Sequence, residues 1–140
     1  DFIDAYFARY PKIQEYLDRT LEEARRSGKV TTLFGRVRYI PEIHNKSFTV
    51  RGNAERMATN APIQGTAADI LKLAMIALDK RLQDAMMLLT VHDEIVIEVP
   101  ESRASEVAGI VKETMENIFP LAVPLQVDAH YGRSWYDAKE

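Results

Sequence analysis

The sequence contains no cysteine and only three histidines. The missing cysteines exclude disulfides, thiolate metal sites and a cysteine nucleophile, and they fit a reducing compartment. No basic segment leads into an apolar one, so nothing has the pattern of a secretory signal. Uncharged apolar runs such as residues 86–92 are too short to span a bilayer. We therefore expect no membrane partner.

The composition is that of a folded globular protein. The chain has 140 residues, of which 46% are hydrophobic and 28% are charged. This apolar content excludes a disordered tail, and the length suits one domain or a piece of a larger one. Because the sequence opens within a helical apolar pattern, we expect it to be part of a longer protein.

The net charge of −3 conceals an asymmetry along the chain. Residues 1–60 carry a balance of +3 and residues 61–140 a balance of −6, and residues 25–56 alone carry +6. A basic stripe is a candidate footprint for phosphates, since neutralised phosphates release counterions. A solvated helix end and loop would show the same charges, so charge alone leaves both interpretations open.

Apolar periodicity predicts helices and a hairpin in the first third of the chain. Helical spacing covers residues 2–10 and 13–24, with Pro11 between them and Gly28 as a stop. Short strands are expected at residues 30–33 and 37–40 around a turn at 34–36. Residues 41–47 have the composition of a loop.

The remainder predicts a long helix, a second hairpin, a helix and a strand. The long helix covers roughly residues 50–84, with a kink or break at Pro62 and Gly65. Strands at 86–91 and 95–99 form a tight hairpin, followed by a helix from 101 or 102 to about 119 and a last strand at 121–131. Trp135 is expected to anchor the core. The fold class is α+β, with helices packed on a small antiparallel sheet.

Two adjacent carboxylates, Asp93 and Glu94, lie at the tip of the otherwise apolar second hairpin. An aspartate there is desolvated unless a positive charge meets it. A divalent ion such as Mg²⁺ would supply that charge, since it favours one or two carboxylates plus water and phosphates. A plain polar turn is the alternative that spacing alone favours.

A polar stripe is predicted on the long helix. Arg56, Asn60 and Gln64 follow one another at intervals of four residues, which places them on one helical face. These side chains hydrogen-bond to base edges and sugars, although an ordinary exposed face has the same pattern. Gly65 next to the stripe predicts either a close approach by another segment or relief of a kink.

Several stretches together resemble the bacterial family A DNA polymerases over essentially the whole chain. The matching segments are TLFGR at 32–36, RYIP at 38–41, AERMA at 54–58, NAPIQGTAAD at 60–69 and VHDE at 91–94, with Pro124, Leu125, Gly132 and Trp135. The order and spacing of the two segments at 60–69 and 91–94 make the resemblance specific.

The resemblance implies a right-hand polymerase architecture. Residues 1–50 would be the end of the fingers subdomain and residues 51–140 the C-terminal half of the palm. Asp93 would be one of two metal-binding aspartates, and Glu94 an auxiliary catalytic carboxylate beside it. His92 would lie near the primer terminus.

The resemblance also implies DNA contacts. Arg56, Asn60 and Gln64 match residues that follow the minor groove of the primer–template. Arg36 and Arg38 would lie on the template side.

The activity implied is DNA-directed DNA polymerisation in replication or repair, with transfer of a nucleotide from a dNTP to the primer 3′-hydroxyl. The cofactor implied is Mg²⁺, two ions in the intact enzyme. A bacterial, cytoplasmic and nucleoid-associated location is implied as well.

The departures from the family pattern lead to further expectations. The family's first motif, with the other metal-binding aspartate, and the helix that holds the triphosphate would lie upstream. Residues 82–90 are somewhat short against the family spacing. We therefore expect the chain alone to be inactive, and to self-associate because the second hairpin lacks its neighbouring strand.

Two alternatives remain open. One is a nucleic-acid-binding module without chemistry. The other is a metal-dependent phosphohydrolase or nuclease, which needs a second acidic cluster. Asp69, Asp79 and Asp84 are spaced poorly for one site, so this alternative ranks last.

Overall fold

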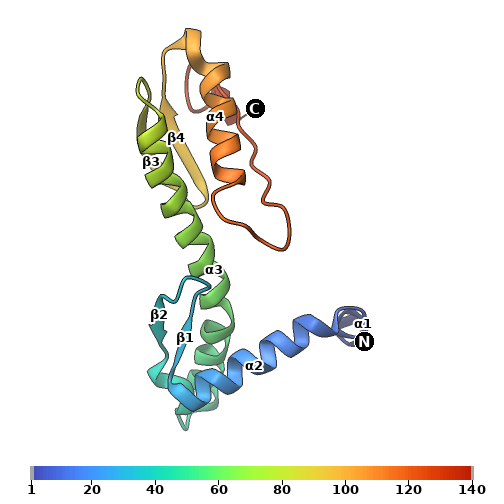
Figure 1. The fold of residues 1–140 in the computed structure, drawn as a ribbon. Coiled ribbons are helices and arrows are strands. Elements are labelled where there is room, and N and C mark those ends of the chain that lie inside the picture. Colours follow the sequence, from blue (N-terminus) through green and yellow to red (C-terminus); the bar gives the residue numbers. More distant parts are fainter. Residues whose placement is uncertain (1, 140) are drawn as a thin grey trace. The chain divides into compact units, whose positions relative to one another are not determined.

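A computed structural model describes residues 2–139, which form two compact units that divide between Thr66 and Ala67 (Figure 1). The first unit holds helices α1 (Phe2–Arg9) and α2 (Pro11–Ser27), strands β1 (Lys29–Thr31) and β2 (Val37–Tyr39), and the 3-10 helix η1 (Pro41–His44). Helix α3 (Phe48–Arg81) begins in this unit and ends in the second.

Local sequence signals set the boundaries of α2. Pro11 occupies its first turn, where a missing N–H costs no hydrogen bond. Gly28 ends it in the left-handed conformation, with φ 71°, and donates its N–H to the Ala24 carbonyl at 2.8 Å. The predicted stop at Gly28 is confirmed, and Pro11 starts the helix.

The first predicted hairpin is confirmed with shorter strands. β1 and β2 pair antiparallel, with Lys29 opposite Tyr39 and Thr31 opposite Val37. Gly35 takes φ 81° in the connecting turn, a conformation that favours glycine. Residues 41–44, expected as loop, form η1, which begins at Pro41.

The core of the first unit is small and aliphatic. It joins α2, β1, η1 and the start of α3 through Ala24, Val30, Ile40, Ile43, Ala54 and Ala58. The alanines let α2 and α3 contribute to one core without large side chains between them.

The expected break in the long helix is wrong, because α3 continues through both Pro62 and Gly65. Proline removes one backbone donor, and the flanking hydrogen bonds hold the helix. The Thr66 hydroxyl adds a bond to the Pro62 carbonyl at 2.6 Å. Gly65 instead lets Thr32 approach the helix closely, because a Cβ at residue 65 would lie 2.6 Å from the Thr32 methyl carbon.

By length and composition alone, α3 is able to cross a membrane. The core helix of a soluble protein passes the same test. Ala54 and Ala58 on α3 are buried in the core of the first unit, although only 11% of the candidate membrane window is buried. The absence of a membrane partner stays a prediction.

The second unit contains the second hairpin and helix α4. Strands β3 (Met86–Val91) and β4 (Glu94–Glu98) pair antiparallel, with an irregularity between Met87 and Leu89 that shifts the register. The 3-10 helix η2 (Glu101–Arg103) leads into α4 (Ala104–Glu116), and η3 (Asp137–Lys139) lies near the C-terminus. The buried residues are Ala74, Leu78, Val107 and Thr114.

Polar contacts tie α4 to the end of α3 in this unit. The Arg81 guanidinium donates to the Thr114 hydroxyl at 2.7 Å. Arg103 pairs with Asp84 at 2.5 Å and with Glu106 at 3.0 Å. The hydrogen bond from Arg103 lowers the pKa of Glu106 below its usual range.

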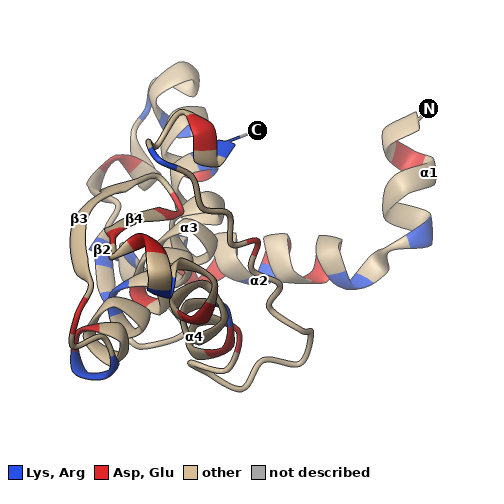
Figure 2. Ribbon diagram, turned by 90° about the horizontal axis from the view of Figure 1, so that it is seen from above, with Lys and Arg blue, Asp and Glu red and all other residues tan. Residues whose placement is uncertain are grey.

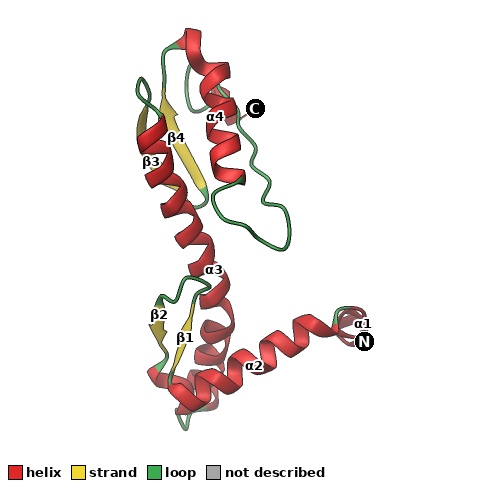
Figure 3. Ribbon diagram, in the orientation of Figure 1, coloured by secondary structure: helices red, strands yellow, loops and turns green. Residues whose placement is uncertain are grey.

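Three expectations for the C-terminal part are wrong. Helix α4 ends at Glu116 rather than near 119. Residues 121–131 form an irregular segment instead of a strand (Figure 3), because a β-rich sequence becomes a strand only when another strand accepts its hydrogen bonds. Trp135 is 43% exposed, so it does not anchor a core.

The α+β class is confirmed. Within residues 2–139, the helices accompany two separate two-stranded antiparallel sheets, one in each unit, rather than one sheet. The expected boundary between fingers and palm near residue 50 stays a prediction.

Candidate functional site

The predicted polar stripe lies on the exposed side of α3 in the first unit. Arg56, Asn60 and Gln64 are all exposed. Ala54 and Ala58 on the same helix are buried in the core. The burial of these alanines therefore fixes which face of the helix carries the stripe.

The two candidate arginines of the first hairpin both contact this part of α3. The Arg36 guanidinium donates to the Gly65 carbonyl at 3.1 Å, and Arg38 contacts the Met57 sulfur at 3.2 Å. Met57 and Gly65 each follow a stripe residue in the sequence. The structure thus brings Arg36 and Arg38 against the helix that carries the stripe.

Hydrogen bonds from the turn fix the hairpin against α3. The Leu33 N–H donates to the Thr66 hydroxyl at 2.9 Å, and the Arg36 N–H donates to the Thr32 hydroxyl at 3.1 Å. Gly65 leaves room for Thr32 at this contact. The arginines are positioned by packing that depends on one glycine.

Some of the basic excess in residues 25–56 is neutralised locally. Arg25 pairs with Glu55 at 2.8 Å. Arg26 pairs with Glu23 at 2.5 Å and lowers the pKa of that carboxyl through a hydrogen bond. Acidic and basic residues both occur along α2 (Figure 2). The charges of Arg25 and Arg26 are therefore balanced by nearby carboxylates.

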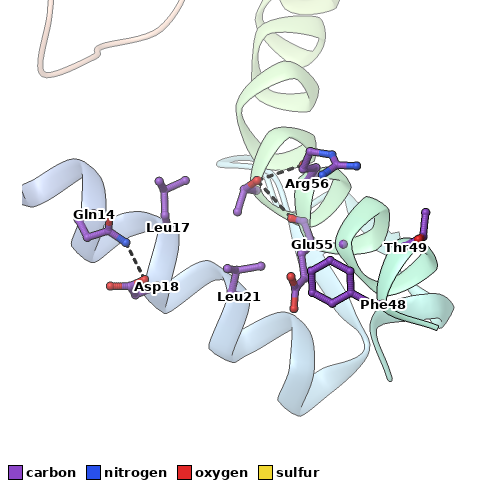
Figure 4. Close-up of a pocket in the computed structure, with 10 residues that line it drawn as sticks. Gln14, Leu17, Asp18, Leu21, Phe48, Thr49, Glu55 and Arg56 are labelled. Carbon is purple, nitrogen blue, oxygen red and sulfur yellow. Dashed lines mark hydrogen bonds between the residues drawn. The ribbon is translucent and has the colours of Figure 1, made fainter. Parts of the chain in front are cut away.

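A pocket of about 500 Å³ lies between α2 and the first turns of α3 (Figure 4). Leu17 and Leu21 line it from α2, and Phe48 and Arg56 from α3. Phe48 is 81% exposed. The pocket thus adjoins the stripe through Arg56, a relation that sequence periodicity does not reveal.

The second hairpin turns tightly at His92 and Asp93, since Val91 already pairs with Glu94. His92 has φ 56°. A two-residue hairpin loop needs positive φ at its first position, where glycine is usual. A histidine there costs roughly 1–2 kcal/mol, and such local strain motivates a functional hypothesis for the position.

Asp93 and Glu94 are both exposed at this tip, so the expected desolvation of Asp93 is wrong. The Glu94 carboxylate lies 3.5 Å from the Lys139 ammonium. Lys139 was not a sequence candidate, because no spacing pattern connects it with the hairpin. His92, Asp93 and Glu94 form one turn of the second unit, and the stripe belongs to the first.

The donor set at the tip suits part of a metal site. Within residues 2–139, no group of three or more His, Cys, Asp or Glu side chains is arranged to hold an ion. Mg²⁺ takes one or two carboxylates, with water and phosphate oxygens in its other positions. Asp93, exposed and adjacent to Glu94, fits such a partial site.

Comparison with known proteins gives a consistent result. A family model described as DNA polymerase family A matches residues 1–137. DNA polymerase I, thermostable, of Thermus thermophilus is 54% identical over 99% of this chain and 17% of its own length. DNA polymerase I of Streptococcus pneumoniae is 53% identical over 99% of the chain and 16% of its own length.

A solved structure is similar as well. The POL domain of Pol1 from M. smegmatis, in complex with DNA primer-template and dNTP, aligns with a TM-score of 0.89 and 45% identity. The alignment covers 99% of this chain and 25% of that one. The chain therefore spans only a small part of the proteins it matches.

Proposed function

Since the chain belongs to DNA polymerase family A, we propose that it forms the C-terminal portion of a template-directed DNA polymerase in replication or repair. Family A DNA polymerases are metal-dependent enzymes. The proposal rests on the sequence comparison: over 99% of the chain, more than half of the aligned residues are identical to those of enzymes named DNA polymerase I.

The exposed stripe is proposed to contact the primer–template. Arg56, Asn60 and Gln64 offer hydrogen-bond donors to the minor groove, where every base pair shows acceptors in similar places. Contacts of this kind accept all sequences, as a polymerase must. Arg36 and Arg38, held against α3, would add phosphate contacts on the template side.

The hairpin tip is proposed to supply one side of the catalytic centre. Asp93, exposed at the tip, would bind Mg²⁺, and Glu94 would lie beside it. The bound ions would lower the pKa of the primer 3′-hydroxyl and stabilise charge on the transferred phosphate. His92 would position the primer terminus.

The remaining assignments rest on the family. Residues 1–50 would belong to the fingers and 51–140 to the palm. Both ions in the intact enzyme would be Mg²⁺, and the dNTP would be held mostly by residues outside this chain. The location proposed is the bacterial cytoplasm, in association with the nucleoid.

The test is Asp93→Ala in the full-length polymerase. We expect nucleotide addition to be nearly abolished while primer–template binding survives. Metal stabilisation of a phosphoryl transition state contributes several kcal/mol, and about 1.4 kcal/mol is tenfold in rate. Single-turnover extension and a binding titration measure the two quantities.

Asp79→Ala is the matched control, because Asp79 is an exposed aspartate on α3 of the same unit. It should extend primers at the rate of the unchanged enzyme. An Asp93→Ala enzyme within about tenfold of that rate would end the assignment.

A nucleic-acid-binding module without chemistry is the second candidate. It is favoured by the lack of a complete metal-ligand group within residues 2–139. Salt-dependent duplex binding that does not respond to Mg²⁺, in the full-length protein, would support it. A nuclease would need further acidic ligands beyond these residues, so it stays last.

A further inference from the structure

We propose that Lys139, carried by the C-terminal turn, is a positioning residue that holds Glu94 in an ion pair and leaves Asp93 as the carboxylate for a divalent cation. The inference rests on the proposed function, because it assigns different roles to two adjacent carboxylates of the same site. The ion pair joins Lys139 Nζ to Glu94 Oε2 at 3.5 Å.

The ion pair by itself would be weak. The Lys139 and Glu94 side chains are 53% and 49% exposed. Exposed pairs contribute little, because water screens the charges and two flexible side chains must be ordered. A positioning role therefore requires that the backbone beneath Lys139 is already ordered.

Hydrogen bonds supply that order in the segment from Ser134 to Lys139. The Ser134 hydroxyl donates to the Asp137 carboxylate at 2.8 Å and accepts from the Asp137 N–H at 3.2 Å. The Ala138 N–H donates to the Ser134 carbonyl, and the Lys139 N–H to the Tyr136 carbonyl, both at 3.1 Å. These bonds form the turn that includes η3.

Gly132 is required for the turn to fold back on itself. A Cβ at Gly132 would lie 2.7 Å from the Asp137 Cβ and 2.9 Å from the Ala138 nitrogen. Real Cβ contacts are not this short, and one of the two neighbours is backbone. Only glycine lets residue 132 and residues 137–138 come so close.

The Lys139 side chain is held a second time by Trp135. Its ammonium lies 4.9 Å from the centre of the Trp135 ring, within the range of a cation–π contact. The half-exposed Trp135 thus has a function in this turn that a core anchor would not have. Lys139 is fixed between the ring and the Glu94 carboxylate.

The consequence concerns the two carboxylates at the hairpin tip. A lysine ammonium beside Glu94 already neutralises that carboxylate and repels a second cation from it. Neither an ion pair nor a hydrogen bond to Asp93 is found within residues 2–139. A divalent cation is therefore directed to Asp93.

The ion pair is tested first, by iodide quenching of Trp135, the only tryptophan of the chain. In Glu94→Gln, Lys139 loses its countercharge beside the ring, and iodide quenching should rise about twofold. In Lys139→Met, quenching should fall, and adding Glu94→Gln to that variant should change nothing further.

Two control variants complete the quenching experiment. Asp93→Asn should leave iodide quenching as it is, since Lys139 contacts Glu94. Lys80→Met removes one positive charge from helix α3, which precedes strand β3. This variant should leave iodide quenching unchanged. Unchanged quenching in Glu94→Gln, or an equal rise in Asp93→Asn, would overturn the ion pair.

The division of roles is tested by Mn²⁺ binding to this chain, followed by electron paramagnetic resonance. Asp93→Asn should abolish the site. Lys139→Met should tighten Mn²⁺ binding about threefold, because a nearby positive charge is removed. Lys139→Arg should match the unchanged chain, and Gly132→Ala should behave as Lys139→Met does.

The outcomes separate the inference from the proposed function. Loss of Mn²⁺ binding in Asp93→Asn, with no change in Lys139→Met, would overturn the positioning role and leave the metal role of Asp93 intact. Unaltered Mn²⁺ binding in Asp93→Asn would overturn the metal role itself, and with it the division between the two carboxylates.

Discussion

At the residue scale, Gly65 shows how one position supports a binding surface without belonging to it. The Thr32 methyl carbon occupies the space that a Cβ at residue 65 would fill. The adjacent Gly65 carbonyl accepts from Arg36. Packing at this glycine therefore decides where the hairpin places its arginines.

We predict that Gly65→Ala destabilises the chain by about 1–3 kcal/mol, because a methyl group forced into a close contact displaces its neighbours. Chemical denaturation measures the change. Gly52→Ala is the control on the same helix: nothing lies within 4 Å of a Cβ there, so alanine should stabilise the helix by up to about 1 kcal/mol. Equal effects of both substitutions would show that the contact with Thr32 is unimportant.

At the scale of the element, α3 presents opposite faces to different surroundings. We predict that Arg56→Ala and Gln64→Ala in the full-length polymerase weaken primer–template binding or the sensing of mispairs, without sequence preference. Each lost contact should cost about 1–3 kcal/mol. Binding titrations on several duplexes and extension past a mismatch measure these effects.

Helix α2 offers matched controls for the stripe. Arg19→Ala and Gln14→Ala remove the same chemical groups there, Arg19 from an exposed position and Gln14 from a half-buried one. They should bind and extend as the unchanged protein does. If the α3 variants behave like these controls on every duplex, the stripe is ordinary surface.

At the scale of the whole molecule, the isolated chain should not extend a primer. Residues 2–139 hold no complete group of metal ligands, and the chain spans only 17% of a relative named DNA polymerase I. A primer-extension assay on the purified chain checks this expectation. Measurable extension would contradict it and return the metal-dependent phosphohydrolase or nuclease to consideration.

The second hairpin predicts self-association of the isolated chain. Within residues 2–139, β3 pairs only with β4. Strand β3 contains no charged residue, and its side chains Met86, Leu88 and Leu89 are exposed. An uncharged strand edge recruits other chains. Pairing of two β3 strands brings no like charges together, whereas antiparallel pairing of two β4 strands would place Glu94 opposite Glu98.

Size-exclusion chromatography with light scattering tests the association. We expect a mass near twice 15.9 kDa, since pairing through β3 joins two copies. Leu88→Lys should shift the chain toward monomer, because a lysine on an edge strand opposes pairing. Val123→Lys is the control, since Val123 is exposed outside any strand. A monomer at high micromolar concentration would refute the prediction.

Several features followed from the sequence alone because their causes are local. Helix α2 starts at Pro11 and ends at Gly28 by rules of backbone geometry. The interval of four residues placed Arg56, Asn60 and Gln64 on one face, and the structure confirms that this face is exposed. The α+β class and the DNA polymerase family were also determined at this level.

The tertiary structure decided what depends on residues distant in the sequence. Residues 121–131 are β-rich, yet no strand among residues 2–139 accepts their hydrogen bonds, so they remain irregular. Helix α3 passes through Pro62 because the bonds around it outweigh one lost donor. Lys139 reaches Glu94 only because Gly132 lets the terminal turn fold back, and no pattern of spacing encodes a contact that packing creates.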